Sequence, residues 1–89
     1  MKIILNDYRN FIISYVPAND NIEKWYLENF GFIMKLIRSY IKDFGWAFGG
    51  ASELYLDMDT LYKEHPYNLE DKYGEETKTV KPYYILSAA

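Results

Sequence analysis

The chain contains no cysteine, and its 89 residues include only one histidine, two arginines and three prolines. The lack of cysteine excludes disulfide bonds, thiolate zinc sites and cysteine nucleophiles, and it fits a reducing compartment. No stretch approaches the about 18 uninterrupted apolar residues of a membrane span. The apolar run after Met1 ends at Asn6, too early for a signal peptide. These absences predict a cytoplasmic protein with no membrane partner and no cofactor.

Aromatic side chains are abundant instead, with ten tyrosines, five phenylalanines and two tryptophans in a chain that is 49% apolar. They supply material for one core, and a chain of this length leaves no room for a second. We therefore expect a single domain over residues 1–89.

Two β-rich runs, residues 2–5 and 11–16, flank a polar turn and predict an N-terminal hairpin that Pro17 closes. Another run, residues 79–86, predicts a C-terminal strand, which Pro82 would place at a sheet edge or bulge.

A long amphipathic helix is predicted over residues 20–44. Asp20 would cap it, with Glu23 completing a capping box, and apolar residues recur behind them in steps of three and four. Gly31 costs about 1 kcal/mol relative to alanine but does not shift this phase, so one helix is favoured over two. Gly45 is a natural residue to end it.

The next segment is ambiguous, because residues 52–64 fit both a strand and a helix. Good helix formers favour a helix that ends before Pro66, and residues 66–78 are expected to form an exposed loop. The sum is an α+β fold, with helices on one face of a small antiparallel sheet.

One short stretch, Gly45-Trp46-Ala47-Phe48-Gly49-Gly50-Ala51-Ser52, is close to a phosphate-binding loop. Such a loop follows a strand, opens a helix and carries a lysine that reaches the phosphates. Here a helix precedes the loop, and Ala51 stands where the lysine belongs. We interpret the stretch as the end of a helix and a joint between two aromatic anchors.

Catalytic residues are sparse, and the sequence predicts a protein that is not an enzyme. His65 precedes a proline at an expected helix end, where interaction with the helix C-terminus explains it adequately. Asp57 and Asp59 could bind Mg²⁺ or Ca²⁺ as a minimal metal hydrolase, but this spacing is common and a solvated acidic face is favoured. No metal site is predicted.

The strongest functional signal is an acidic, tyrosine-rich surface. Residues 53–76 carry eight acids, two lysines and four tyrosines, although the net charge of the whole chain is only −3. Such a surface could imitate phosphates and occupy the basic groove of a larger nucleic-acid-binding protein, and tyrosine is frequent at interfaces. The predicted contact residues are Glu53, Tyr55, Asp57, Asp59, Tyr62, Tyr67, Glu70, Asp71, Tyr73, Glu75 and Glu76.

This device is similar in type to that of small phage-borne nuclease inhibitors. The many lysines and isoleucines resemble AT-rich coding. Together they suggest a phage-type inhibitor of a defence enzyme, such as a CRISPR nuclease, in the cytoplasm of the host. A plain solvated face is the alternative.

A second hypothesis uses the opposite charge. Lys24, Lys35, Arg38 and Lys42 lie near one line of the predicted helix and could bind a DNA or RNA backbone. The sequence pI of about 5.0 argues against direct nucleic-acid binding. A homodimer through an edge strand or exposed aromatic residues stays open.

Overall fold

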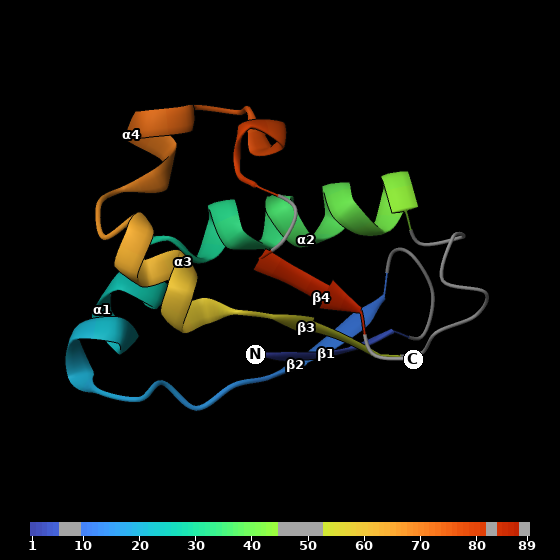
Figure 1. Ribbon diagram of the computed structural model, residues 1–89, viewed down its shortest axis with the longest axis horizontal. Coiled ribbons are helices and arrows are strands. Elements are labelled where there is room, and N and C mark those ends of the chain that lie inside the picture. The colour runs from blue at the N-terminus through green and yellow to red at the C-terminus, as the bar shows by residue number, and fades with distance from the viewer. Residues whose placement is uncertain (6–9, 45–52, 82–83, 88–89) are drawn as a thin grey trace.

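The computed structural model describes residues 1–5, 10–44, 53–81 and 84–87 (Figure 1). Predictions that fall on residues 45–52 and 82–83 lie outside this part of the chain. In chain order the elements are β1 (Lys2–Leu5), β2 (Phe11–Ser14), α1 (Asp20–Glu28), α2 (Phe30–Phe44), β3 (Glu53–Leu56), α3 (Met58–Glu64), α4 (Leu69–Tyr73), the 3-10 turn η2 (Thr77–Thr79) and β4 (Ile85–Ser87).

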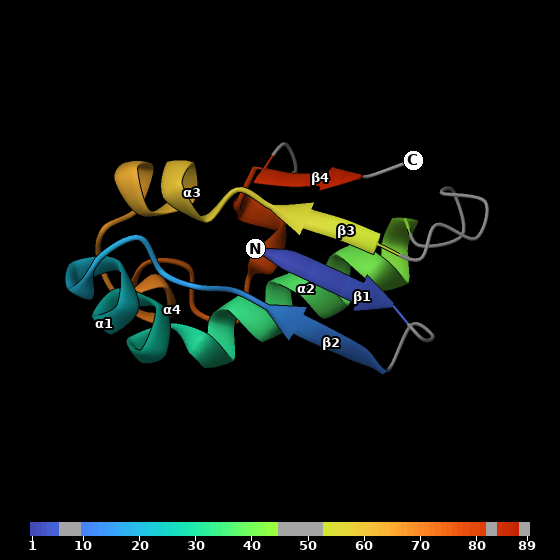
Figure 2. The ribbon, with the colours of Figure 1, turned by 90° about the horizontal axis from the view of Figure 1, so that it is seen from below.

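The sheet has the strand order β2-β1-β3-β4, and every neighbouring pair is antiparallel (Figure 2). Ile3, Leu54 and Leu56 point to one face and are buried, whereas Ile12 and Tyr55 point to the other face and are exposed. This alternation is that of a sheet with one covered face. The predicted N-terminal hairpin and the α+β fold class are both confirmed.

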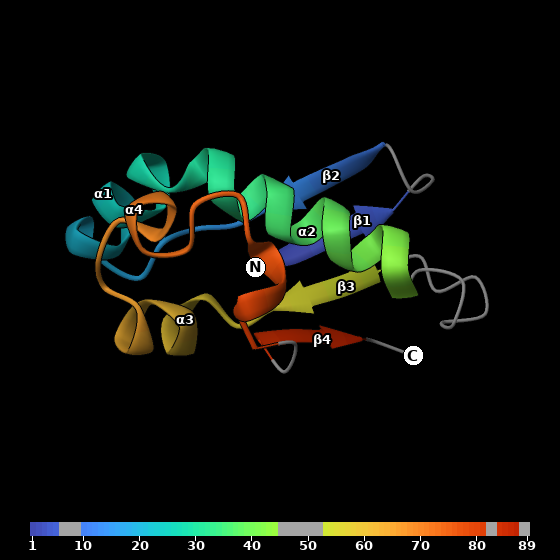
Figure 3. The same ribbon diagram turned by 90° about the horizontal axis from the view of Figure 1, so that it is seen from above.

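Helix α2 lies across the covered face, while α1 and α3 lie beyond one end of the strands (Figures 1 and 3). Its buried side chains Phe32, Ile33 and Ile37 enter the same core as Ile3 and Leu54. Helix α4 packs along the first half of α2, where the Tyr73 ring lies 6.2 Å from the Phe32 ring between centroids. The fold therefore places the acidic segment that follows α3 beside the helix that carries three of the four candidate cations.

The prediction of one long helix, straight or bent, over residues 20–44 is wrong at one residue, because Asn29 separates α1 from α2. The backbone bonds from Asn29 to Trp25 and from Ile33 to Asn29, both 2.9 Å, still keep helical spacing across it. Asn29 is 2% exposed, and its side-chain amide nitrogen donates to the Trp25 carbonyl over 2.9 Å. Its side-chain oxygen accepts the Leu69 N–H at 2.7 Å, which satisfies a donor at the start of α4. The interruption thus has a tertiary cause and does not involve Gly31. The helix begins at Asp20 as predicted, but its N-cap is Asn19 in place of Asp20.

The ambiguous segment forms both predicted structures in succession, so our preference for a helix alone over residues 52–64 is wrong for its first part. Glu53–Leu56 pairs with β1 as a strand, and Asp57 then caps α3 by accepting the Thr60 N–H at 3.2 Å. Asp57 is therefore the boundary between two patterns that overlap in the sequence.

Two further predictions need correction. The expected exposed loop over residues 66–78 contains α4, which Asn68 caps by accepting the N–H groups of Glu70 and Asp71. Of the strand expected over residues 79–86, Thr79 belongs to η2 (Thr77–Thr79), and the strand itself, β4, begins at Ile85.

We predict that Asn29→Ala lowers the free energy of unfolding by about 2–3 kcal/mol, because it leaves the buried Leu69 N–H without its acceptor. The matched control is Asn68→Ala, which removes an exposed helix cap worth about 1 kcal/mol. Urea unfolding of both variants measures the difference. Equal losses in the two variants would show that Asn29 is an ordinary cap.

Candidate functional site

None of the eleven residues predicted for the acidic surface is buried, but the structure separates them by element. Glu53 and Tyr55 lie on β3 and point to the uncovered face of the sheet. Glu53 is already engaged, because its carboxylate pairs with Lys2 at 3.2 Å and accepts the Tyr55 hydroxyl at 3.4 Å. These two residues therefore belong to the sheet face and lie apart from the acids of α4.

Asp57 and Asp59 lie at the start of α3. Asp57 is half-buried and has a structural task, since its carboxylate also accepts the Thr60 hydroxyl at 2.8 Å. Asp59 is exposed in the first turn, where a negative charge stabilises the helix dipole. Asp57 is thus the N-cap of α3, and Asp59 interacts favourably with the N-terminal end of its dipole.

Four acids remain around α4, and we call Glu70, Asp71, Glu75 and Glu76 the α4 acidic patch. All four are exposed. Lys35 of α2 pairs with Glu75 at 3.1 Å and with Glu70 at 3.7 Å. Hydrogen bonding to Glu75 raises the pKa of Lys35. Among the described residues, Asp71 and Glu76 form no ion pair, so the patch keeps a negative balance beside this lysine.

The tyrosines of the predicted surface pack against the domain. The Tyr62 ring lies edge-on to Trp25, with centroids 5.3 Å apart. Tyr67 is 38% exposed, and Tyr73 is half-buried between Phe32 and His65. Tyr67 alone of these three combines exposure with a place next to the α4 acidic patch.

His65 is the centre of a cluster that the sequence did not reveal. Its Nδ1 lies 2.6 Å from the Tyr67 hydroxyl and 3.1 Å from the Tyr73 hydroxyl, and its Nε2 lies 3.4 Å from the Tyr84 hydroxyl. All three tyrosine rings meet the imidazole edge-on, with centroids 5.6 to 5.8 Å away. The only sequence signal was the density of tyrosines near the single histidine.

The chemistry of this cluster is that of a structural network. Desolvation by burial is the largest effect on the pKa of His65 and lowers it; the charge of Glu64 opposes this, and Lys81 and Lys72 lower the pKa further by smaller amounts. The hydrogen bond with Tyr67 raises the pKa of Tyr73 to about 12, so this hydroxyl stays protonated at neutral pH. At neutral pH the lowered pKa leaves the His65 imidazole mostly uncharged.

The four candidate cations do not act as one basic ridge. Lys24 lies on α1 and the other three lie on α2. The side chain of Lys35 turns toward α4, whereas the Arg38 guanidinium lies 5.8 Å from the centre of the Phe11 ring on β2. Lys42, the fourth candidate cation, lies in the last turn of α2. Their charges therefore face different neighbours.

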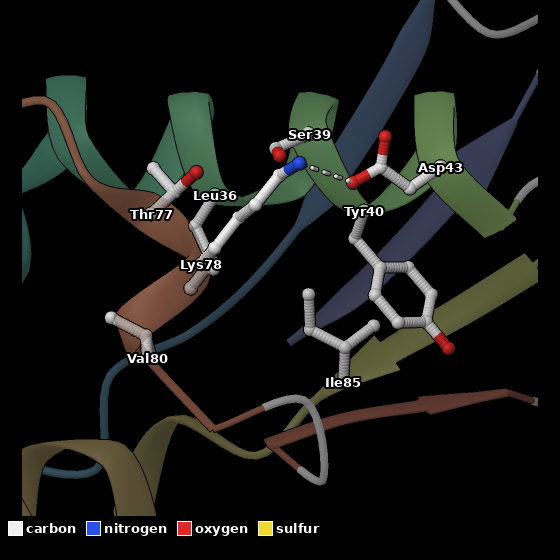
Figure 4. Close-up of a pocket in the computed structure, with 8 residues that line it drawn as sticks. All are labelled: Leu36, Ser39, Tyr40, Asp43, Thr77, Lys78, Val80 and Ile85. Atoms are coloured by element: carbon white, nitrogen blue, oxygen red, sulfur yellow. Dashed lines mark ion pairs between the residues drawn. The ribbon is translucent and has the colours of Figure 1, made fainter.

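A hollow of about 290 Å³ lies between α2, η2 and β4 (Figure 4). Figure 4 shows the Lys78 side chain extended toward Asp43, and their charged atoms are 3.8 Å apart. The hollow is lined by Leu36, Ser39, Tyr40, Asp43, Thr77, Lys78, Val80 and Ile85. The hollow could receive a small apolar group.

The described residues were also compared with the requirements of a metal site and of a membrane-spanning helix. No group of three or more His, Asp or Glu side chains in this part of the chain is arranged to hold a metal ion. Within the same residues, no helix combines the length and apolar character that crossing a membrane requires.

Comparison with known proteins returns no match: no family model fits the sequence, and no curated protein or solved structure is significantly similar to it. The function is therefore inferred from the surface chemistry described above.

The His65 cluster predicts a pH dependence of stability. Because folding lowers the pKa of His65 from its ordinary 6.5, the unfolded chain binds the proton more tightly. The stabilisation is therefore complete above pH 6.5 and is lost as the pH falls from there through the lower pKa of the folded state. Urea unfolding between about pH 7.5 and 5.5, above the carboxylate range, should show this slope.

The control for this experiment is His65→Gln, which removes the only histidine and should flatten the slope whatever its effect on overall stability. An NMR titration of the single imidazole gives the folded pKa directly. A value at or above 6.5 would contradict the account of a desolvated histidine.

Proposed function

We propose that the chain is a non-enzymatic binding protein that occludes the nucleic-acid-binding site of a larger protein. The observation that carries this proposal is the α4 acidic patch, which sets four exposed carboxylates on one short helix and the turn after it. A nucleic-acid site holds phosphates with Arg and Lys, and carboxylates can form the same charge-assisted pairs. A phage-type inhibitor of a defence nuclease is one protein of this class, suggested by residue usage alone.

The surroundings of the patch support a binding role. Asn68 caps α4 and Lys35 pairs with two of the acids, so Glu70 and Glu75 are oriented before a partner arrives. Oriented groups lose less entropy on binding than free ones do. Tyr67 adds an exposed ring at the margin. Asp71 and Glu76 remain available for new pairs with a basic groove.

The other predicted contact residues take lesser parts in the proposal. Glu53 and Asp57 are occupied within the domain, and Tyr62 and Tyr73 pack against it. Tyr55 and Asp59 are exposed but lie on β3 and α3, apart from α4. We therefore reduce the proposed contact surface to the α4 acidic patch and Tyr67. Direct nucleic-acid binding through Lys24, Lys35, Arg38 and Lys42 is the alternative, and the pairing of Lys35 with Glu75 weakens its case.

The test neutralises the patch with Glu70→Gln, Asp71→Asn, Glu75→Gln and Glu76→Gln together. The wild-type chain should capture a basic protein from nuclease-treated lysate and release it at high salt, because salt screens exposed charge pairs. The variant should bind that protein at least about tenfold more weakly.

The matched control is Asp20→Asn, Glu23→Gln, Glu28→Gln and Asp59→Asn, which removes four exposed acids elsewhere and gives the same net charge. It should retain binding within about threefold, since only long-range steering changes. If both variants bound the partner equally weakly, the α4 acidic patch would not be the contact surface. If the wild-type chain captured nucleic acid alone, and nuclease treatment abolished this capture, the alternative of direct nucleic-acid binding through the four cations would be favoured.

A further inference from the structure

Strand β2 is an outer strand of the sheet, and its outward backbone groups can be identified from the hydrogen bonds of its neighbours. Met1 and Leu56 exchange two backbone hydrogen bonds of 2.9 Å, which fixes the residues of β1 that bond to β3. In antiparallel sheets the bonding direction alternates along a strand. Ile12 therefore bonds to β1, and the backbone groups of Phe11 and Ile13 face away from the sheet.

This edge carries no protection of the usual kind. Outer strands commonly bear charged residues or a proline that prevents pairing with another strand. The β2 sequence Phe11–Ser14 has neither, and Pro17 comes only after it. Ile12 is 56% exposed and Val16 is 89% exposed. An uncharged and apolar edge is suited to pairing with a further strand.

A groove runs beside this edge, between β2 and α2, with a volume of about 440 Å³. Three of its lining residues, Phe30, Met34 and Arg38, follow one another at intervals of four along α2 and so lie on one side of it. Phe30 is 44% exposed, although it is a large aromatic residue. Phe30 and Arg38 are exposed, whereas Met34 between them is buried, so this side of α2 presents a ring and a cation about two turns apart.

This side of α2 is self-complementary. A two-fold axis beside Met34 would place the α2 helices of two copies antiparallel to each other. The Phe30 ring of one copy would then lie near the Arg38 guanidinium of the other. Cation–π pairs of this kind are favourable. A two-fold axis through β2 also pairs that strand with itself in antiparallel orientation, as closed dimers require.

We propose that β2 is a homodimer interface, through which two copies of this chain form one continuous eight-stranded sheet from their two four-stranded sheets. In the proposed register Ile12 lies opposite Ile12 of the second copy. Phe11 then exchanges hydrogen bonds with Ile13 of the second copy, through the groups that face outward. This register buries the exposed Ile12 side chains against each other, whereas a shift by two residues would set Ile12 opposite Ser14.

The first test measures mass by sedimentation equilibrium over a range of concentrations. The wild-type chain should reach twice its 10.6 kDa monomer mass. Ile12→Lys should raise the dimer dissociation constant at least about tenfold, since it removes apolar burial and puts a charge on the edge. Tyr55→Lys is the control, because Tyr55 is exposed on the same sheet face but lies on the interior strand β3.

Either of two results would overturn the proposal. One is a wild-type mass that stays at 10.6 kDa up to about 1 mM, as expected if the edge is empty or takes a peptide from another protein. The other is a dimer that Ile12→Lys leaves as stable as Tyr55→Lys does.

The second test uses the natural lack of cysteine, so that an introduced thiol has no competitor. In the proposed register the two Ile12 Cα atoms lie about 4.5 Å apart, within the range that a disulfide spans. Ile12→Cys should therefore form a covalent dimer under mild oxidation at least about tenfold faster than Ser14→Cys, which faces no copy of itself. Equal rates would contradict the pairing. This outcome is independent of the α4 acidic patch.

Discussion

The buried side chain of Asn29 holds together the two halves of the domain that the sequence keeps forty residues apart. One end of its amide closes the last turn of α1 by bonding to Trp25, and the other end receives the first N–H of α4. A buried amide with both ends satisfied stabilises one arrangement, whereas a buried amide with one end unpaired would cost free energy. The position of α4, and of every acid it carries, depends on this side chain.

Trp25 extends the same connection to the loop before α4. Its indole N–H lies 2.9 Å from the His65 carbonyl oxygen and 3.2 Å from that of Tyr67, so one donor is shared between two acceptors. The imidazole of His65 then gathers three tyrosine hydroxyls around it. The imidazole and the three hydroxyls satisfy one another, so these tyrosines contribute to the fold even though Tyr67 remains 38% exposed.

Much of the architecture could be predicted from local patterns. The β-rich composition of β1 and β2 and the apolar period of α2 each reflect a single element, so a short window of sequence contains the whole signal. The interruption at Asn29 could not be predicted, because its cause is the Leu69 N–H, which only the folded chain brings near.

The candidate site was predictable in the same uneven way. The eight acids of residues 53–76 indicate that this segment is negatively charged. The sequence does not indicate which face of the domain each acid lies on. Only the structure separates Glu53, paired with Lys2 on the sheet, from Glu75, paired with Lys35 on α2. The capping role of Asp57 was hidden because the segment fitted two patterns until its neighbours selected one.

If the α4 acidic patch takes the place of phosphates, DNA must compete with this chain for the partner's nucleic-acid site. We would test this competition first. A short DNA duplex is titrated into the complex of this chain with its captured partner, at constant ionic strength. If the patch occupies the nucleic-acid site, the apparent dissociation constant of the chain should rise in proportion to the DNA concentration, because the two ligands exclude each other. A ternary complex, in which DNA binds and the chain stays bound with unchanged affinity, would contradict the account.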